Sequence, residues 1–191
     1  MNNQSIFAFC IRICISTTLA VATSFFFLYV SQADNPQAHV GYPTRITIPT
    51  IGLDQEIQPV GIIPVIVDGA TYFTWDVLDN HIGWHNRSAF LGQTGNTVLS
   101  GHSDVKGRVF QNLHNLHIGD EITVMSERQS YRYIITQKLL VQEKGASIET
   151  RIKNAQWIAS TEDERLTLVT CAQPGATHRL IVVARPVSKI H

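Results

Sequence analysis

Apolar and polar side chains alternate in short runs along most of the chain, and helical periodicity is weak throughout. Such runs lie at residues 45–51, 56–67, 96–100, 120–126, 131–141, 166–170 and 180–184. Alternation with period two and short β-branched runs predict strands, and the Gly and Pro residues between them favour turns. The pattern therefore predicts an all-β fold of about eight strands that form a closed or nearly closed β-barrel with short helical turns.

Three local features refine this expectation. Residues 120–126 and 131–141 flank a short polar segment, which predicts a hairpin. Helical turns are expected near 107–113 and 154–158. No repeat of fixed period and no stretch of low complexity is visible, so one domain accounts for all the predicted strands.

The N-terminal part has a different pattern. Residues 13–30 form an apolar run of 18 residues without a formal charge, and Arg12 precedes it. That length is just sufficient for a helix to cross a bilayer. A basic residue on the N-terminal side of the run predicts that everything after Val30 lies outside the cytoplasm.

These patterns predict three parts of the chain. We expect residues 1–30 to be an N-terminal signal or transmembrane anchor in the cell membrane, crossing it once. Residues 31–44 are polar, hold two prolines and suit a tether. Residues 45–191 form the extracytoplasmic domain. The small residues at 31–33 also suit a signal peptidase, and cleavage there would make the domain a secreted one.

Composition narrows the class of protein. The chain has 191 residues, which allows one globular domain with short appendages and excludes a multidomain machine. The 15 Lys and Arg residues cancel the 15 Asp and Glu residues, so the basic surface needed to bind nucleic acid is absent. With 44% hydrophobic residues the domain has enough apolar side chains for a core.

Cysteine usage leaves one thiol to explain. Cys10 and Cys14 lie in or beside the apolar segment, so only Cys171 belongs to the exported domain and no disulfide can form within it. A lone cysteine in such a domain is either a buried hydrophobic residue or a free reactive thiol. Its neighbours in the sequence must decide between the two.

Arg179 is the first such neighbour. Cys171 ends a strand-like run, Arg179 opens the next one, and a Pro-Gly turn signal lies between them. If the two runs pair as antiparallel strands, the thiol and the guanidinium lie at the same end of the sheet, whereas Arg185 lies at the other end. A fixed cation favours the thiolate and can donate to an oxyanion formed when the thiolate attacks a carbonyl.

A proton carrier is also needed, and His102 is well placed for it. It follows the apolar run 96–100 at the point where a strand gives way to a loop. One imidazole can take the thiol proton and protonate a leaving amine. The residues alone leave eight histidines to choose from.

These residues together resemble the signature of the sortases, cysteine transpeptidases of bacterial surfaces. The pattern is Thr-Leu-Val-Thr-Cys at 167–171 followed by Arg179, with Val-Leu-Ser-Gly-His at 98–102 upstream. Further sortase-like landmarks occur in the expected order at 46–53, 83–84, 95–96 and 116–122. The resemblance covers residues 45–187 and implies an eight-stranded sortase barrel. It also implies Cys171 as nucleophile, His102 as the acid for the leaving group, and Arg179 as the substrate-orienting and oxyanion-stabilising cation.

The resemblance further implies an activity and its partners. Sortases cleave a Leu-Pro-X-Thr-Gly type sorting signal between Thr and Gly, form an acyl-enzyme thioester, and transfer the protein to an amine. The expected partners are therefore secreted proteins with C-terminal sorting signals and a peptidoglycan precursor or pilin amine. No cofactor is implied. The compact form, with a short segment between Cys171 and Arg179, resembles the D, E and F groups more than the B or C groups.

Two further residues are candidates for substrate contact. Thr170 precedes the nucleophile and could position substrate, although strand packing alone would also explain a threonine there. Asp104 follows His102 and could approach the site, although a solvated loop carboxylate is the simpler interpretation.

The paired histidines could bind a metal and the tryptophans could bind a ligand, but a structural role is the simpler interpretation of both. His81 and His85 are four apart and His114 and His117 three apart, a spacing that suits metal ligands on a helix. Neither segment has helical periodicity or a well-spaced carboxylate, so we expect polar loop residues and no metal site. The three tryptophans are expected to be core residues.

Three rival functions remain open at this stage. A papain-like hydrolase would have its cysteine early, at a helix start, whereas here Cys171 ends a strand and follows His102. A non-catalytic, membrane-anchored β-barrel binding module would make Cys171 a buried core residue. A cysteine hydrolase could use the same thioester and release it to water.

Overall fold

The computed structural model describes residues 41–67, 69–127, 129–172 and 177–187. Within the chain, Ala38–His191 form one compact unit. Its elements, in chain order, are β1 (Arg45–Ile48), η1 (Pro49–Ile51), β2 (Leu53–Val60), β3 (Ile62–Val67), β4 (Ala70–Trp75), β5 (Ile82–His85), β6 (Asn96–Ser100), η2 (Leu113–Asn115), β7 (Glu121–Met125), β8 (Ser130–Gln142), α1 (Ile148–Ala155), η3 (Gln156–Ile158), β9 (Arg165–Ala172) and β10 (His178–Pro186).

The predicted anchor at 1–30 and most of the predicted tether at 31–44 lie outside the described residues. Among the residues that are described, no helix has both the length and the apolar character needed to cross a bilayer.

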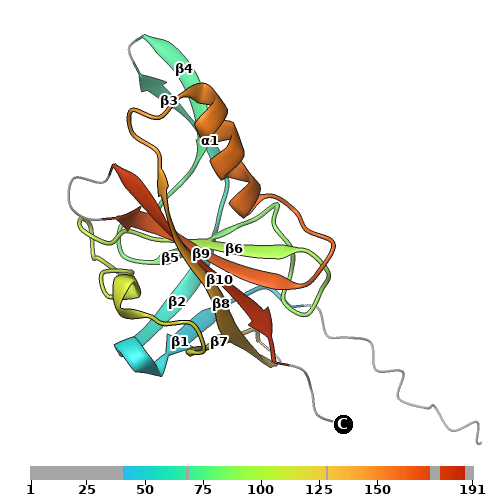
Figure 1. Cartoon of the computed structure of the whole chain (residues 1–191). Helices are drawn as coiled ribbons and strands as arrows, with labels where there is room; N and C mark the ends of the chain where they lie inside the picture. The colour runs from blue at the N-terminus through green and yellow to red at the C-terminus, as the bar shows by residue number, and fades with distance from the viewer. Residues whose placement is uncertain (1–40, 68, 128, 173–176, 188–191) are drawn as a thin grey trace, which may run out of the picture. The chain divides into compact units, whose positions relative to one another are not determined.

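Eight of the strands close into a barrel, in the order β1-β2-β5-β6-β9-β10-β8-β7 (Figure 1). The prediction of a closed eight-stranded barrel is therefore confirmed. The pairs β2–β5 and β6–β9 are parallel, and the other pairs in the barrel are antiparallel. The hairpin predicted from 120–126 and 131–141 is the antiparallel pair β7–β8.

The core follows from the alternation seen in the sequence. In β1 and β7 every second side chain is buried, as expected for strands with one face toward a barrel interior. Ile46, Leu99, Ile122 and Leu168 are fully buried in one cluster. Removing such a side chain from water contributes on the order of 1.5–3 kcal/mol.

One pair of strands stands outside the barrel. The run predicted at 56–67 divides at Gly61 into β2, which belongs to the barrel, and β3, which pairs only with β4. We call β3 and β4 together the β3–β4 ribbon. Figure 1 shows this ribbon projecting from one end of the barrel. The chain therefore has two more described strands than the barrel needs.

The helical segments are displaced from their expected positions. The turn expected near 107–113 is η2, at Leu113–Asn115. The turn expected near 154–158 overlaps η3, but the preceding helix α1 was missed. The helix α1 spans only eight residues, and its two large apolar side chains, Ile148 and Ile152, are exposed. The Ser147 hydroxyl caps it by accepting a hydrogen bond from the Thr150 backbone amide at 3.2 Å.

The prediction that His85 is a loop residue is wrong. It lies in β5 and is 3% exposed. The Trp75 ring stacks on its imidazole with centroids 4.1 Å apart, and Nε2 lies 3.2 Å from Ser100 Oγ. Burial lowers the pKa of His85 to about 4, so the folded protein holds it neutral. Trp84 is a core residue as predicted, whereas Trp75 and Trp157 are half-buried and lie outside the core cluster.

Candidate active site

The parallel pairing of β6 with β9 brings the predicted site residues to one edge of the barrel. Ser100 lies opposite Val169 in the register, and the Gly101 amide donates to the Val169 carbonyl at 3.3 Å. Because parallel strands end at the same edge, the residues that follow these positions meet there. His102 follows β6 by two residues, and Cys171 is next to the last residue of β9.

Arg179 lies directly across from Cys171. The two residues are paired in the antiparallel register of β9 and β10, and Arg179 Nη1 donates to Cys171 Sγ at 3.3 Å. The predicted antiparallel pairing and the proximity of the two side chains are both confirmed. Ala172 and His178 are also paired in this register, so only residues 173–177 connect the two strands.

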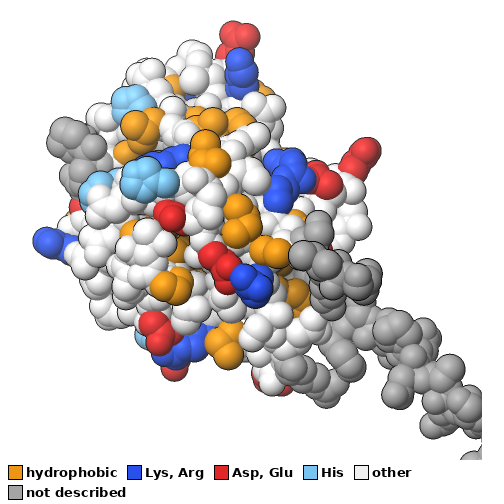
Figure 2. All heavy atoms as spheres, turned by 60° about the horizontal axis from the view of Figure 1, so that its bottom comes forward, with side chains coloured by type: hydrophobic (Ala, Val, Ile, Leu, Met, Phe, Trp, Pro, Cys, Tyr) orange, Lys and Arg blue, Asp and Glu red, His pale blue; other side chains and the backbone are white. Residues whose placement is uncertain are grey.

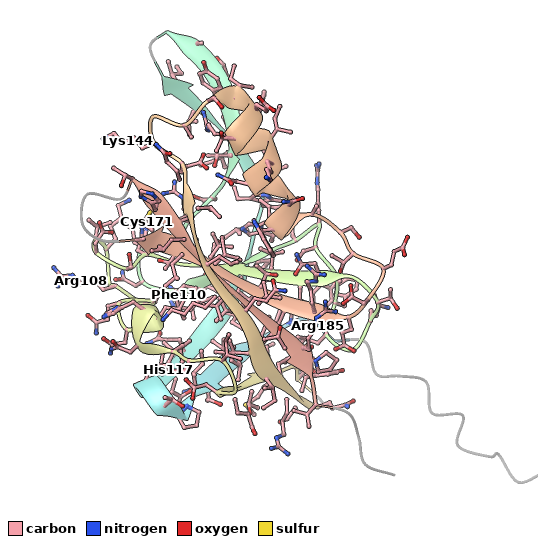
Figure 3. All side chains as sticks on the ribbon, in the orientation of Figure 1. Arg108, Phe110, His117, Lys144, Cys171 and Arg185 are labelled. Atoms are coloured by element: carbon pink, nitrogen blue, oxygen red, sulfur yellow. The ribbon has the colours of Figure 1, made fainter. Side chains whose placement is uncertain are left out.

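Arg185 provides an internal comparison. Figure 3 shows it at the opposite end of the sheet from Cys171. Its guanidinium forms an ion pair with Asp163. The expectation that Arg185 lies at the other end of the strand is therefore confirmed.

Two side-chain hydrogen bonds join the His102 loop to the end of β9. The Thr170 hydroxyl donates to the Gly101 carbonyl at 2.7 Å, and the Ser103 hydroxyl donates to the Cys171 carbonyl at 2.6 Å. They flank His102 on both sides, and its own carbonyl accepts from the Phe110 amide at 2.9 Å. The backbone of His102 is thereby held in one position relative to Cys171.

Gly101 allows the loop to pass this close to its neighbours. A Cβ atom at this position would lie 2.7 Å from Val109 Cγ2 and 3.0 Å from Phe110 Cδ2. Both neighbours are buried, so neither can move away cheaply. A glycine before His102 is therefore a packing requirement of the site.

The imidazole of His102 is half-buried. Its Nε2 atom is buried and has no hydrogen-bond partner among the described residues. An imidazole nitrogen that makes no other hydrogen bond keeps its capacity to exchange a proton. Asp104 is also half-buried, in the loop that follows.

A cavity of about 510 Å³ opens beside the thiol. It is lined by Ser103, Phe110, Gln111, His114, Lys138, Leu139, Leu140, Thr170, Cys171, Ala172 and Leu180. The lining is mostly apolar and includes Cys171 itself, so an apolar or extended peptide group can lie against the nucleophile. Thr170 lines the cavity as well, although its hydroxyl already donates to Gly101.

Sequence reasoning missed several residues of this site. Ser103 could have been noticed because it follows His102 and carries a hydroxyl. Phe110 and Leu140 gave no signal, because they are ordinary hydrophobic residues that only the barrel brings to the thiol. Figure 3 shows Phe110 beneath the end of the sheet that carries Cys171.

Within the described part of the chain, no group of three or more His, Cys, Asp or Glu residues could hold a metal ion. The Nδ1 atom of His114 lies 2.9 Å from the carbonyl oxygen of Gln111, three residues earlier in the chain. His117 is exposed in the turn before β7.

Comparison with known proteins identifies the family. The Sortase domain family model matches residues 46–187. The chain therefore belongs to the sortase family, whose members are cysteine transpeptidases. No curated protein matches the sequence.

Solved structures of sortases have the same fold. A Clostridium perfringens sortase D5 transpeptidase is 25% identical with a TM-score of 0.57, over 78% of this chain and 79% of that one. Sortase C1 from Streptococcus agalactiae is 25% identical with a TM-score of 0.57, over 76% and 67%. Sortase A from Corynebacterium diphtheriae is 22% identical with a TM-score of 0.59, over 80% and 63%. Sortases of classes A, C and D are therefore almost equally similar to this barrel.

Proposed function

We propose that this sortase cleaves a Leu-Pro-X-Thr-Gly type sorting signal between Thr and Gly and transfers the protein to an amine. Cys171, His102 and Arg179 carry the reaction. The observation that supports this most directly is the 3.3 Å contact between Arg179 Nη1 and Cys171 Sγ at the edge where the His102 loop is tied to β9. A cation in contact with the sulfur lies where it can donate to the oxyanion that forms when the sulfur attacks a carbonyl.

The first half of the reaction forms the thioester. The Cys171 thiol gives its proton to His102, and its sulfur attacks the threonine carbonyl carbon. The carbonyl electron pair moves to the oxygen, where Arg179 donates to the oxyanion. As the carbonyl re-forms, the bond from carbon to the glycine nitrogen breaks. The departing amine takes a proton from His102. Nε2 of His102 has no hydrogen-bond partner among the described residues, so no such bond competes with this transfer.

The second half reverses the proton transfer. An incoming amine gives its proton to His102 and attacks the thioester carbon, and the Cys171 sulfur leaves. The product is a new amide bond to a peptidoglycan precursor or to a pilin amine. One of the structural neighbours is a pilus-related sortase C of Group B Streptococcus, which accords with such acceptors. Water in place of the amine would turn the same thioester into a hydrolase reaction.

Location follows from the sequence. We place the domain outside the cytoplasm, joined to the membrane by the apolar segment 13–30 after Arg12. Sorting signals of secreted proteins would reach it there. We also propose that the protein belongs to the compact D, E or F groups of sortases, because the segment between Cys171 and Arg179 is short.

Intact-mass spectrometry tests the chemistry. The compact unit Ala38–His191 is incubated with a panel of sorting-motif peptides, with and without glycine-type amines. We expect a thioester adduct on wild-type protein, no adduct on Cys171→Ala, and discharge of the adduct by the amine. Discharge by water alone, unaffected by amines, would identify a hydrolase.

The binding-module alternative has a separate outcome. If no peptide gives an adduct and iodoacetamide does not modify Cys171 in the folded protein, the thiol is structural. The half-buried state of Cys171 and its place in the wall of a cavity argue against that result.

A further inference from the structure

The β3–β4 ribbon exposes an unusual amount of apolar surface. Ile66 is 77% exposed, Phe73 74% and Tyr72 51%. Neither β3 nor β4 contains a Lys, Arg, Asp or Glu residue. An isolated two-stranded ribbon is only marginally stable in water, and exposed apolar strands of this kind promote association. The ribbon is therefore typical of a surface that binds to another surface in the working protein.

One face of the ribbon is a continuous apolar strip. Residues two apart on a strand share a face, and the register pairs Pro64 with Phe73 and Ile66 with Thr71. This face holds Ile62, Pro64 and Ile66 from β3 and Thr71, Phe73 and Trp75 from β4. The strip begins at Trp75, which stacks on His85, and runs outward from the barrel.

The face at the bottom of the domain is different in kind. Figure 2 shows the face at the bottom of Figure 1, where hydrophobic side chains are interspersed with Lys, Arg, Asp and Glu. Single exposed hydrophobic residues among charges are normal for a protein surface, whereas a charge-free strip marks an interaction site.

The chain itself points to the occupant. The uncharged segment 13–30 is long enough to enter a bilayer, and only residues 31–40 separate it from Gly41, the first described residue. Those residues reach at most roughly 33–36 Å when fully extended. A domain on such a short tether stays close to the membrane. Its effective concentration at the lipid surface is therefore high, and even a weak apolar contact is populated. Tyr, Trp and Phe side chains are also typical of proteins that lie at a membrane surface.

We propose that the β3–β4 ribbon lies with its apolar strip on the outer surface of the lipid bilayer. This inference rests on the membrane anchoring proposed above and is independent of the transpeptidation. Because the ribbon carries no basic residue, the contact is hydrophobic and does not depend on anionic lipids or on ionic strength.

The base of the ribbon joins this contact to the active site. The Asp76 amide donates to the Gly61 carbonyl at 3.0 Å, closing the ribbon where it leaves the barrel. Trp75 stacks on His85, whose Nε2 contacts Ser100, two residues before His102. Figure 3 shows Cys171 at the end of the barrel from which the ribbon projects. A docked ribbon therefore holds the Cys171 end toward the membrane.

Fluorescence quenching in nanodiscs tests this docking. The full chain is placed in phosphatidylcholine nanodiscs with ordinary or brominated acyl chains, and the emission added by Phe73→Trp over the wild type is measured. The matched control is Ile118→Trp, because Ile118 is 70% exposed and follows His117, which Figure 3 places at the other end of the barrel.

We expect bromine to reduce the added Phe73→Trp emission about twofold, since an interfacial side chain lies about 5–10 Å deep, and to leave the Ile118→Trp emission unchanged. The result should be the same at low and high salt. Equal alkylation of Cys171 in both variants and the wild type shows that each is folded.

Three outcomes would overturn the proposal. If the chain has entered the nanodisc but bromine does not reduce the emission added by Phe73→Trp, the ribbon contact is refuted. The membrane anchoring is then unaffected. A chain that does not enter the nanodisc refutes the anchoring and this inference with it, while the thioester assay remains a separate measure of the chemistry. Sedimentation as a dimer that Phe73→Ser converts to a monomer would show that a second copy covers the ribbon.

Discussion

At the scale of single residues, the site consists of a thiol, a cation and an imidazole held by backbone contacts. Arg179 reaches the Cys171 sulfur from the neighbouring strand, and Ser103 and Thr170 fix the chain on either side of His102. Neither hydroxyl needs to touch substrate for this purpose. The residues that act and the residues that position them are therefore separable by experiment.

Arg179 and Arg185 offer a matched pair on the same strand. We expect Arg179→Lys to lower kcat/KM for thioester formation about 100-fold or more, because a lysine cannot reproduce the planar donor set at the sulfur and the oxyanion. Arg185→Lys should leave the rate unchanged, since Arg185 pairs with Asp163 at the far end. Stopped-assay mass spectrometry measures both, and equal rates for the two variants would remove Arg179 from the mechanism.

Ser103 is predicted to be a positioning residue. Its hydroxyl donates to the Cys171 carbonyl at 2.6 Å, and loss of a hydrogen bond of this kind costs about 1 kcal/mol. We expect Ser103→Ala to lower kcat about fivefold with little change in KM, because the loop carrying His102 is loosened while the peptide groove is kept.

Ser103→Thr supplies the control for this prediction, since threonine keeps the hydroxyl. It should restore most of the kcat lost in Ser103→Ala. A purely structural role would instead lower the melting temperature of Ser103→Ala without separating kcat from KM.

At the scale of elements, the parallel pair β6–β9 decides the site. Thr167 donates to the Asn96 side chain at 2.7 Å between these strands, and the amide of Asn96 donates to the carbonyls of Trp157 and Ala159. All three bonds fix the strand that leads to His102. The neighbouring strand β5 contributes buried His85, which supports Ser100 and the ribbon base.

His85 should make the fold sensitive to acid. Its pKa is lowered to about 4 by burial, against 6.5 for an exposed imidazole, so only the unfolded chain binds a proton between these values. Stability is therefore complete above pH 6.5 and falls by about 3 kcal/mol as the pH drops to 4.

Thermal unfolding of wild type and His85→Gln measures this effect. At neutral pH the variant should be less stable, because it loses the stacking on Trp75. Between pH 6.5 and pH 4 its melting temperature should fall less than that of the wild type. Parallel pH profiles for the two proteins would assign the acid sensitivity to other groups.

At the scale of the whole molecule, a closed barrel leaves no free strand edge, whereas the ribbon attached to it has two edges and two apolar faces. The barrel can therefore be stable by itself, whereas we expect the ribbon to be stabilised by contact with the membrane. The compact unit Ala38–His191 contains all eight strands of the barrel. Folding and membrane attachment are therefore expected to be separable.

Truncation tests this separation. The unit Ala38–His191 should melt within about 2 °C of the full chain in detergent, because an unchanged core leaves the free energy of unfolding unchanged. It should form the thioester at the same rate. Membrane fractionation should find the full chain, and not the truncated one, resistant to alkaline carbonate. A truncated protein that is markedly less stable would mean that the N-terminal residues are part of the folded domain.

Local signals in the sequence predicted most of the barrel and part of the site. Period-two alternation revealed strands such as β1 and β7, and the turn between Cys171 and Arg179 revealed their pairing. Helix α1 was missed because its eight residues are too few to show a helical period clearly. The ribbon was missed because the apolar run at 56–67 predicts a single strand region. An apolar run looks the same in the sequence whether its side chains face a core or solvent.

The sequence by itself determined the fold class, the antiparallel contact of Cys171 with Arg179 and the family signature, because each depends on neighbours along the chain. The tertiary structure alone decided what lies beside the thiol. The β6–β9 pairing joins residues about seventy positions apart, and it brings Gly101 and Ser103 to the end of β9. Barrel closure then sets the cavity wall and leaves the ribbon outside. Such contacts depend on the packing of the whole barrel, which no local pattern records.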